Sequence, residues 1–221
     1  MRILVLGDSH SLVFRRCNRV QKNVRFTLCV VNGATAQGVV NPNSKTDALN
    51  HFRETLKGVN PANFDYVMVN LGEVDCGFVM WFRANKHNIS IDDQLSLSTT
   101  NLFNFVREEL LPLFDASKII INGSVFPVIV DNNNRKFLCG ARKAVTASIV
   151  ERTDLTIRYN QILKTGAAEN GYNYMDINKH VVDPTTNTVK PEFRRANAHN
   201  HHLSFSATCG FWLTELSNIG H

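Results

Sequence analysis

The stretch RILVLGDSH, residues 2–10, is the part of the chain from which its fold can be worked out. Its apolar run is typical of a buried strand, and residues 11–17 after it have helical apolar spacing. Ser9 is therefore predicted at a strand-to-helix turn, above the carboxyl edge of a sheet, where open α/β sheets bind ligands. The positive end of the helix favours a negative charge there. The same position also suits a serine that only caps the helix, and position alone leaves both interpretations open.

The composition predicts one globular domain over residues 1–221. Hydrophobic residues make up 43% of the chain and charged residues 19%, an ordinary globular balance. The net charge is +5, and the basic residues are scattered apart from the pairs Arg15-Arg16 and Arg194-Arg195. Such pairs are more typical of a solvated face than of a polyanion site, so we expect no nucleic-acid partner.

The five cysteines indicate a reduced, cytoplasmic protein. Their number is odd and no two of them form a CxxC pair, which does not suit a disulfide framework. The N-terminal apolar run is too short for the core of a signal peptide. No apolar run approaches the ~18 residues that span a bilayer, so no membrane span is expected.

Strand and helix patterns alternate about five times along the chain. This order predicts right-handed crossovers and an α/β fold, with a parallel sheet that carries helices on both faces. The strands are expected at residues 2–6, 25–31, 64–71, 118–122 and 172–177, and the main helices at 11–17, 44–57, 91–111, 144–168 and 204–218.

Polar residues and glycines follow the first four predicted strands, and the carboxyl ends of parallel strands meet at one edge. A serine hydroxyl needs a base to become a nucleophile, and a histidine just before the last helix could reach back to Ser9. The backbone amides of Ser9 and Gly33 would supply two donors to an oxyanion. Together these groups meet the requirements of acyl transfer. The residues expected at this edge are Asp8, Ser9, Asn32, Gly33, Gly72, Glu73, Asp75, Asn122, His199, His201 and His202.

The order of these motifs resembles that of the SGNH (GDSL) hydrolases. The similar blocks are Gly7-Asp8-Ser9, Gly33, Gly72 to Asp75, and His202-Leu203-Ser204. The resemblance implies a flavodoxin-like three-layer αβα sandwich with five parallel strands, and ester hydrolysis through a serine. The resemblance also implies that Ser9 is the nucleophile, Gly33 an oxyanion donor and His202 the base. Family substrates are acyl esters, acetylated sugars and lipids.

Two positions depart from the family pattern. Val74 stands where the third block has an asparagine that helps to hold the oxyanion, and His199 stands where the acid of the triad is expected. Asn32 and Asn122 are candidates for the missing donor. The third member of the triad is either absent or comes from another part of the chain, and its candidates are Asp176, Asp183 and Glu192.

The sequence Gly-Glu-Val-Asp-Cys at residues 72–76 resembles the third block of one subgroup of this family, which reads Gly-Glu-Ile-Asp-Cys-Arg. Members of that subgroup are often found near carbohydrate-modifying enzymes. The arginine of that subgroup would fall at position 77, which is a glycine here.

The function expected from these observations is a serine esterase or acyltransferase with a Ser9–His202 mechanism. Its substrate would be a small-molecule or glycan acyl ester, such as an O-acetylated carbohydrate. The alternative is a weakly active or inactive relative that uses the pocket to bind a carbohydrate or acyl ligand. Asp8, Asn32, Gly33, Gly72, Glu73, Asp75 and Asn122 are predicted to form the oxyanion hole or bind the substrate, with His199 as an accessory residue.

No cofactor and no metal are expected. His199, His201 and His202 could form a metal site, but no carboxylate or thiol lies near them at ligand spacing. A nucleotide- or phosphate-binding module of the same fold class is a weaker alternative, because residues 7–10 contain one glycine and form no glycine-rich phosphate loop.

Overall fold

A five-stranded parallel sheet forms the centre of the protein, as the alternation of strands and helices predicts. The structure is a computed structural model and describes residues 1–131 and 140–219. The strand order is β2-β1-β3-β4-β5, so β1 lies beside both β2 and β3. The strands are β1 (Arg2–Gly7), β2 (Arg25–Val30), β3 (Tyr66–Asn70), β4 (Ile119–Asn122) and β5 (Asn173–Met175).

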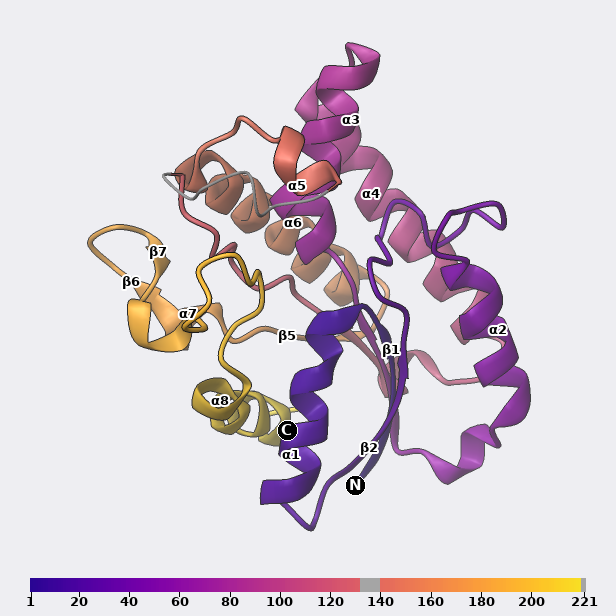
Figure 1. Ribbon diagram of the computed structural model, residues 1–221. Helices are drawn as coiled ribbons and strands as arrows, with labels where there is room; N and C mark the ends of the chain where they lie inside the picture. Colours follow the sequence, from indigo (N-terminus) through magenta and orange to yellow (C-terminus); the bar gives the residue numbers. More distant parts are fainter. Residues whose placement is uncertain (132–139, 220–221) are drawn as a thin grey trace.

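Helices cover both faces of this sheet, which makes a three-layer αβα sandwich (Figure 1). Side chains alternate along a strand, so Leu4 and Leu6 pack into one core and Ile3 and Val5 into the other. The first core is closed by α2 (Ala48–Gly58), α4 (Ile91–Phe105) and α6 (Ile149–Glu169). The second is closed by α1 (Val13–Val20) and α8 (Phe205–Ser217).

Shorter elements lie between these helices and strands. The segment after β3 forms a π-helical turn (Asp75–Val79) followed by α3 (Met80–His87). The remaining elements are the 3-10 turns Ser9–Leu12, Pro61–Asn63, Ala116–Lys118 and Pro191–Phe193, the π-helical turn Val106–Leu110, α5 (Ala141–Ala144), α7 (Asn178–Val181), and the hairpin of β6 (Val182–Asp183) and β7 (Thr188–Val189).

Some helix boundaries differ from the predicted ones for local reasons. The helix expected from residue 44 begins at Ala48, because Asp47 before it has a left-handed backbone with φ +53°. The helix expected from residue 144 begins at Ile149, where Ser148 and Glu151 form a capping box. The helix expected from residue 204 begins at Phe205, and the side chain of Ser204 before it makes no capping hydrogen bond.

Cys17, Cys29, Cys76 and Cys209 are free thiols. Burial raises the pKa of the Cys17 thiol to about 12, which suits a packed rather than a reactive cysteine. Cys139 and residues 132–135 of the polar segment expected to form a mobile loop lie outside the described residues. Within the described ranges, no helix has the length and apolar character needed to cross a membrane.

Candidate active site

Ser9 follows β1 and begins the 3-10 turn that leads into α1. The residue that caps this turn is Asp8, whose carboxylate accepts a hydrogen bond from the backbone N–H of His10 at 2.8 Å. Capping therefore does not occupy the hydroxyl of Ser9. That hydroxyl lies 2.7 Å from Nε2 of His202.

The hydrogen bonds of His202 settle which of its ring nitrogens carries the proton. Oδ1 of Asn200 lies 2.9 Å from the backbone nitrogen of His202 and 2.8 Å from its Nδ1. A backbone N–H can only donate, so the atom facing it must be an acceptor oxygen. The same oxygen then accepts from Nδ1–H, which leaves the lone pair of Nε2 directed at Ser9. Ser9, His202 and Asn200 thus form a chain in which the serine donates to the histidine and the histidine donates to the asparagine.

Four buried ionisable side chains lie next to this chain, and we call Asp8, His10, Glu73 and His201 the charge cluster. The Glu73 carboxylate lies 3.0 Å from Nδ1 of His201 and 3.3 Å from Nε2 of His10. Nδ1 of His10 lies 3.1 Å from the Asp8 carboxylate. All four side chains are at most 10% exposed. The cluster joins the ends of β1 and β3 to the segment before α8.

The charges of the cluster shift the pKa values of its members in opposite directions. Burial favours a neutral His10, but the carboxylates of Glu73 and Asp8 outweigh it and raise the pKa of His10 to about 9. Burial likewise favours a protonated Glu73, but the charges of His10 and His201 lower the pKa of Glu73 to about 2. At neutral pH the cluster therefore holds an ionised Glu73 and a protonated His10.

The pKa of His202 is shifted in the opposite direction from that of His10. Its burial lowers its pKa, and the neighbouring charges of His10 and His201 lower it further, to about 3. The rings of His10 and His202 have centroids 4.4 Å apart, so a protonated His10 disfavours a second positive charge beside it. His202 is consequently neutral at physiological pH, as a general base must be.

A pocket of about 620 Å³ opens above Ser9. Ser9 and Gly33 line it, and the backbone N–H groups of both have no acceptor among the described residues. Asn32 also lines it with an exposed side chain, whereas Val74 contributes only an apolar surface. The lining is formed by Ser9, Leu12, Asn32, Gly33, Val74, Phe78, Arg142, Asn197, His199, Asn200, His201 and His202.

Asp75 lies below this pocket and fixes the loop that carries Gly33. Its carboxylate is fully buried and accepts from the backbone N–H groups of Ala36 and Gln37, at 2.7 and 3.0 Å, and from the hydroxyl of Ser98. Burial raises the pKa of Asp75 despite these bonds. Asp75 therefore supports the pocket and does not line it, which corrects its predicted place among the binding groups.

Of the other residues predicted to bind the substrate, some line the pocket and some do not. Asn32 and Gly33 line the pocket, but Asp8 and Glu73 belong to the charge cluster. Gly72 has φ +131°, and a Cβ there would lie 2.5 Å from the ring of Tyr159, so glycine is required for this close approach.

Asn122 does not lie beside Ser9 either. Its side chain is fully buried and donates to Oδ1 of Asn70 at 2.7 Å. The reason is the strand order: β3 lies between β4 and β1, so the end of β4 meets the end of β3 instead of the serine. Asn122 is therefore no candidate for the oxyanion donor, and Asn32 is the one that remains.

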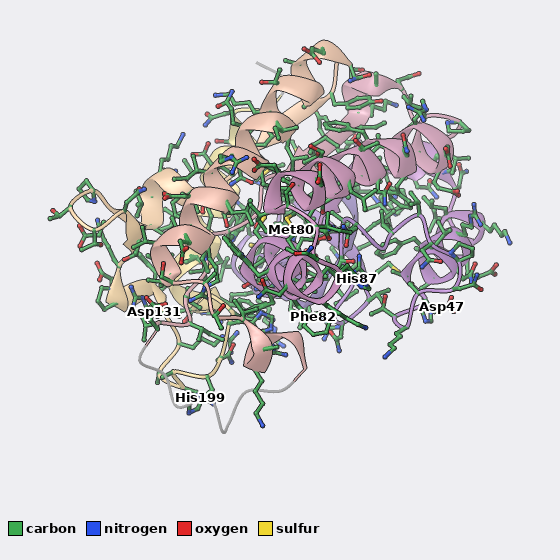
Figure 2. The ribbon with its side chains drawn as sticks, turned by 90° about the horizontal axis from the view of Figure 1, so that it is seen from above. Asp47, Met80, Phe82, His87, Asp131 and His199 are labelled. Carbon is green, nitrogen blue, oxygen red and sulfur yellow. The ribbon has the colours of Figure 1, made fainter. Side chains whose placement is uncertain are left out.

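None of the acids proposed as a third triad member contacts His202. Asp176 accepts from Tyr174 and from the backbone of Asn178, and Asp183 accepts from a backbone N–H in its own hairpin. His199 lines the pocket but lies at the periphery of the molecule, on the loop before α8 (Figure 2).

Sequence reasoning missed Asn200 and His10. Asn200 had a usable signal, because asparagine commonly accepts from the backbone N–H two residues later, which here is that of His202. His10 had none, since its role depends on Glu73 and His201, which are distant in sequence.

Three imidazoles lie close enough together to bind a metal ion, but they are not all from the predicted set of His199, His201 and His202. One ring nitrogen from each of His10, His201 and His202 lies within 4.8 Å of the others. Hydrogen bonds already hold these rings, and the raised pKa of His10 keeps it protonated, whereas a metal ligand must be neutral. Metal binding would thus have to displace both a proton and the contact between Ser9 and His202.

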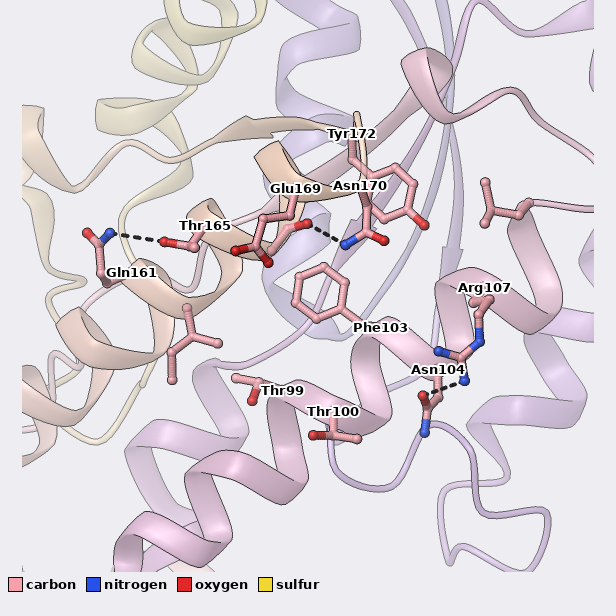
Figure 3. Close-up of a pocket in the computed structure, with 13 residues that line it drawn as sticks. Thr99, Thr100, Phe103, Asn104, Arg107, Gln161, Thr165, Glu169, Asn170 and Tyr172 are labelled. Atoms are coloured by element: carbon pink, nitrogen blue, oxygen red, sulfur yellow. Dashed lines mark hydrogen bonds between the residues drawn. The ribbon is translucent and has the colours of Figure 1, made fainter.

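A second pocket, of about 530 Å³, lies between α4 and α6 (Figure 3). Its side chains bond within their own helices, Gln161 to Thr165 and Arg107 to Asn104. It shares no lining residue with the Ser9 pocket. It therefore has no part in the chemistry considered for Ser9.

The comparisons with known proteins support the fold described above. Neither a protein-family model nor a curated protein matches this sequence. Solved structures do: a GDSL-like lipase from Bacteroides thetaiotaomicron matches with a TM-score of 0.58 and 12% identity, over 98% of this chain and 86% of that one.

Two further solved structures match over similar lengths. A lipase/acylhydrolase from Enterococcus faecalis has a TM-score of 0.55 and 16% identity, over 98% and 95% of the two chains. An acetyl xylan esterase has a TM-score of 0.51 and 11% identity, over the whole of both chains. The chain thus has the α/β fold of the GDSL-like lipases and acylhydrolases.

The lowered pKa of His202 predicts an unusual pH dependence for any reaction that uses it as a base. A histidine whose pKa falls from 6.5 to about 3 stays mostly neutral down to about one pH unit above its lowered pKa. We expect kcat/KM for p-nitrophenyl acetate to stay nearly constant from pH 7 down to roughly pH 4.5. His10→Gln removes the neighbouring positive charge and should move the acidic limb to higher pH, whereas His87→Gln, at the exposed end of α3, should not. An acidic limb near pH 6.5 in the unmodified protein would contradict this assignment.

Proposed function

We propose that this chain is a serine ester hydrolase in which Ser9 is the nucleophile and His202 the general base. The observation that carries the proposal is the hydrogen-bonded chain from Ser9 Oγ through His202 to Oδ1 of Asn200. Its geometry is that of an activated nucleophile, with a base in contact and a third group that orients the base. The fold shared with lipases, acylhydrolases and an acetyl xylan esterase supports the same reading.

The reaction follows from the positions of these groups. Ser9 Oγ attacks the ester carbonyl carbon while Nε2 of His202 takes its proton, and the backbone N–H groups of Ser9 and Gly33 stabilise the oxyanion. His202 then gives the proton to the departing alcohol, which leaves an acyl group on Ser9. Water, activated by the same histidine, releases the acid. An acceptor alcohol in place of that water would make the enzyme an acyltransferase.

Two features predict slow turnover of generic esters. Val74 offers no side-chain donor to the oxyanion, and the loss of one such donor typically costs ~10²–10³ in rate. Asn200 orients His202, but it is neutral and does not stabilise the imidazolium as a carboxylate would. The Glu73 carboxylate of the charge cluster offsets part of this deficit, because it favours positive charge on His202.

We propose further that the substrate is an O-acyl ester of an alcohol or a carbohydrate. The pocket is open to solvent through exposed Asn32 and Asn197, which suits a bulky alcohol moiety. Phe78 supplies an apolar wall, as acyl binding requires.

The direct test is labelling by a fluorophosphonate probe together with hydrolysis of p-nitrophenyl acetate. Ser9→Ala should abolish labelling, and both Ser9→Ala and His202→Ala should lower kcat by at least ~10³-fold. His199→Ala should cost far less, and the exposed His87→Ala serves as the control. If the unmodified protein shows neither labelling nor turnover, the pocket belongs to a binding domain and not to an enzyme.

The position of Asn200 allows a gain-of-function test. Asn200→Asp keeps the acceptor oxygen and adds a negative charge beside Nδ1 of His202, which stabilises the imidazolium and raises the pKa of His202. We expect kcat to rise about tenfold and the acidic limb of the pH profile to move upward. Asn200→Leu, which removes the acceptor at similar volume, should instead lower kcat. A fall in kcat for both variants would show that Asn200 does not orient the base.

A further inference from the structure

A groove lined by five arginines adjoins the Ser9 pocket. Arg15, Arg16 and Arg19 come from α1, and Arg194 and Arg195 come from the segment before α8. The basic pairs Arg15-Arg16 and Arg194-Arg195, from opposite ends of the sequence, thus share one groove of about 820 Å³. Figure 1 shows α1 beside the segment that leads into α8.

The groove is continuous with the catalytic pocket. Leu12, Asn197 and Asn200 line both cavities, and Asn200 also holds His202 in place. Arg195 is near enough to contribute to the lowered pKa of His202, after the larger effects of burial and of His10. A substrate with its ester at Ser9 would therefore extend naturally into the groove.

No acid among the described residues neutralises the five arginines. Within the part of the chain that the structure describes, none of the five takes part in a salt bridge, and no Asp or Glu lines the groove. Arg194 donates to the backbone oxygen of Val189, and Arg195 donates to that of Leu203 and stacks on the ring of Phe205 at 4.2 Å. A guanidinium has five donors, so each of these two is held in place while donors remain for a ligand.

The arginines of α1 stabilise the helix little. Arg15 and Arg19 are four residues apart on one face, where like charges repel. Of the three, Arg19 alone lies in the last turn, where a positive charge is favourable. Helix stability therefore does not account for Arg15 and Arg16.

We propose that the groove binds the anionic part of the substrate, so that the enzyme acts on acyl esters whose alcohol moiety carries several carboxylate or phosphate groups, as an acidic glycan does. A guanidinium group can form paired hydrogen bonds with a carboxylate or with a phosphate. Five guanidinium groups are more than one such anion requires. Asn197, Ser204 and Ser206 supply neutral polar groups for hydroxyls of the same molecule. This inference rests on the proposed function for its ester, but the groove can be tested without turnover.

The kinetic test compares an O-acetylated oligogalacturonate with a neutral O-acetylated xylo-oligosaccharide of equal length. At low ionic strength kcat/KM should favour the acidic substrate by at least ~10-fold, and added salt should reduce this preference. The variant with Arg15→Gln, Arg16→Gln and Arg19→Gln should lose the preference, because its kcat/KM falls far more on the acidic substrate than on the neutral one. Its matched control, with Lys22→Gln, Arg25→Gln and Lys118→Gln, removes equal charge near the amino ends of the strands and should retain it. Equal rates on both substrates, or equal losses in the two variants, would overturn the proposal.

A binding test separates failure of the groove from failure of the esterase. Calorimetry on Ser9→Ala, with unmodified oligogalacturonate and with inorganic tripolyphosphate, measures the groove alone. Binding of either anion that the α1 variant loses supports the proposal, even if no ester is hydrolysed. Absence of binding by both overturns it. Tighter binding of a single-stranded oligonucleotide of equal charge would also overturn it, in favour of a nucleic-acid surface.

Discussion

The carboxylate of Glu73 is the contact on which the arrangement of the site depends. It lies within 3.3 Å of His10 and of His201, and so connects the end of β3 to the segment after β1 and to the segment before α8. All three groups are buried, and removing one partner of such a buried pair typically costs about 3–5 kcal/mol. His202 follows His201 directly, so the contact that anchors His201 also places the imidazole of His202 beside Ser9.

The same cluster sets the electrostatics of His202, the proposed base. Burial and the protonated His10 beside it keep His202 neutral, which leaves its Nε2 free to accept a proton. In the proposed reaction the charge of His10 also opposes the imidazolium, while Glu73 favours it. With a pKa of about 3 and a neutral Asn200 beside Nδ1, His202 would be a weak base whose imidazolium is poorly stabilised. Such a site suits a substrate whose remote groups supply binding energy, as the arginine groove would allow.

The fold could be predicted from the sequence because its determinants are local. The apolar run after Met1 and the alternation of strands with helical patterns lead directly to the parallel sheet that the structure contains. The position of Ser9 also follows, since a strand-to-helix turn at the carboxyl edge is fixed by that alternation. Ser9 contacts His202, the histidine that the family resemblance implies as the base, while its role as the base stays a prediction.

The remaining features of the site could not be predicted because they depend on strand order and on burial. Asn122 and Asn32 both follow strands, but only the structure shows that β3 separates β4 from β1. Glu73 and Asp75 sit in one motif, yet one contacts histidines and the other holds backbone amides of the loop after β2. The two arginine pairs look scattered along the chain until α1 and the segment before α8 come together.

The central claim is that His202 is a neutral imidazole with its proton on Nδ1 and its Nε2 lone pair directed at Ser9. The most direct measurement is ¹⁵N NMR of the protein labelled at histidine, with the His202 signals assigned by their loss in His202→Ala. The account predicts a protonated Nδ1 and an unprotonated Nε2 that stay unchanged as the pH is lowered from 7 to about 4.5. A proton on Nε2, or a titration of His202 near pH 6.5, would contradict it.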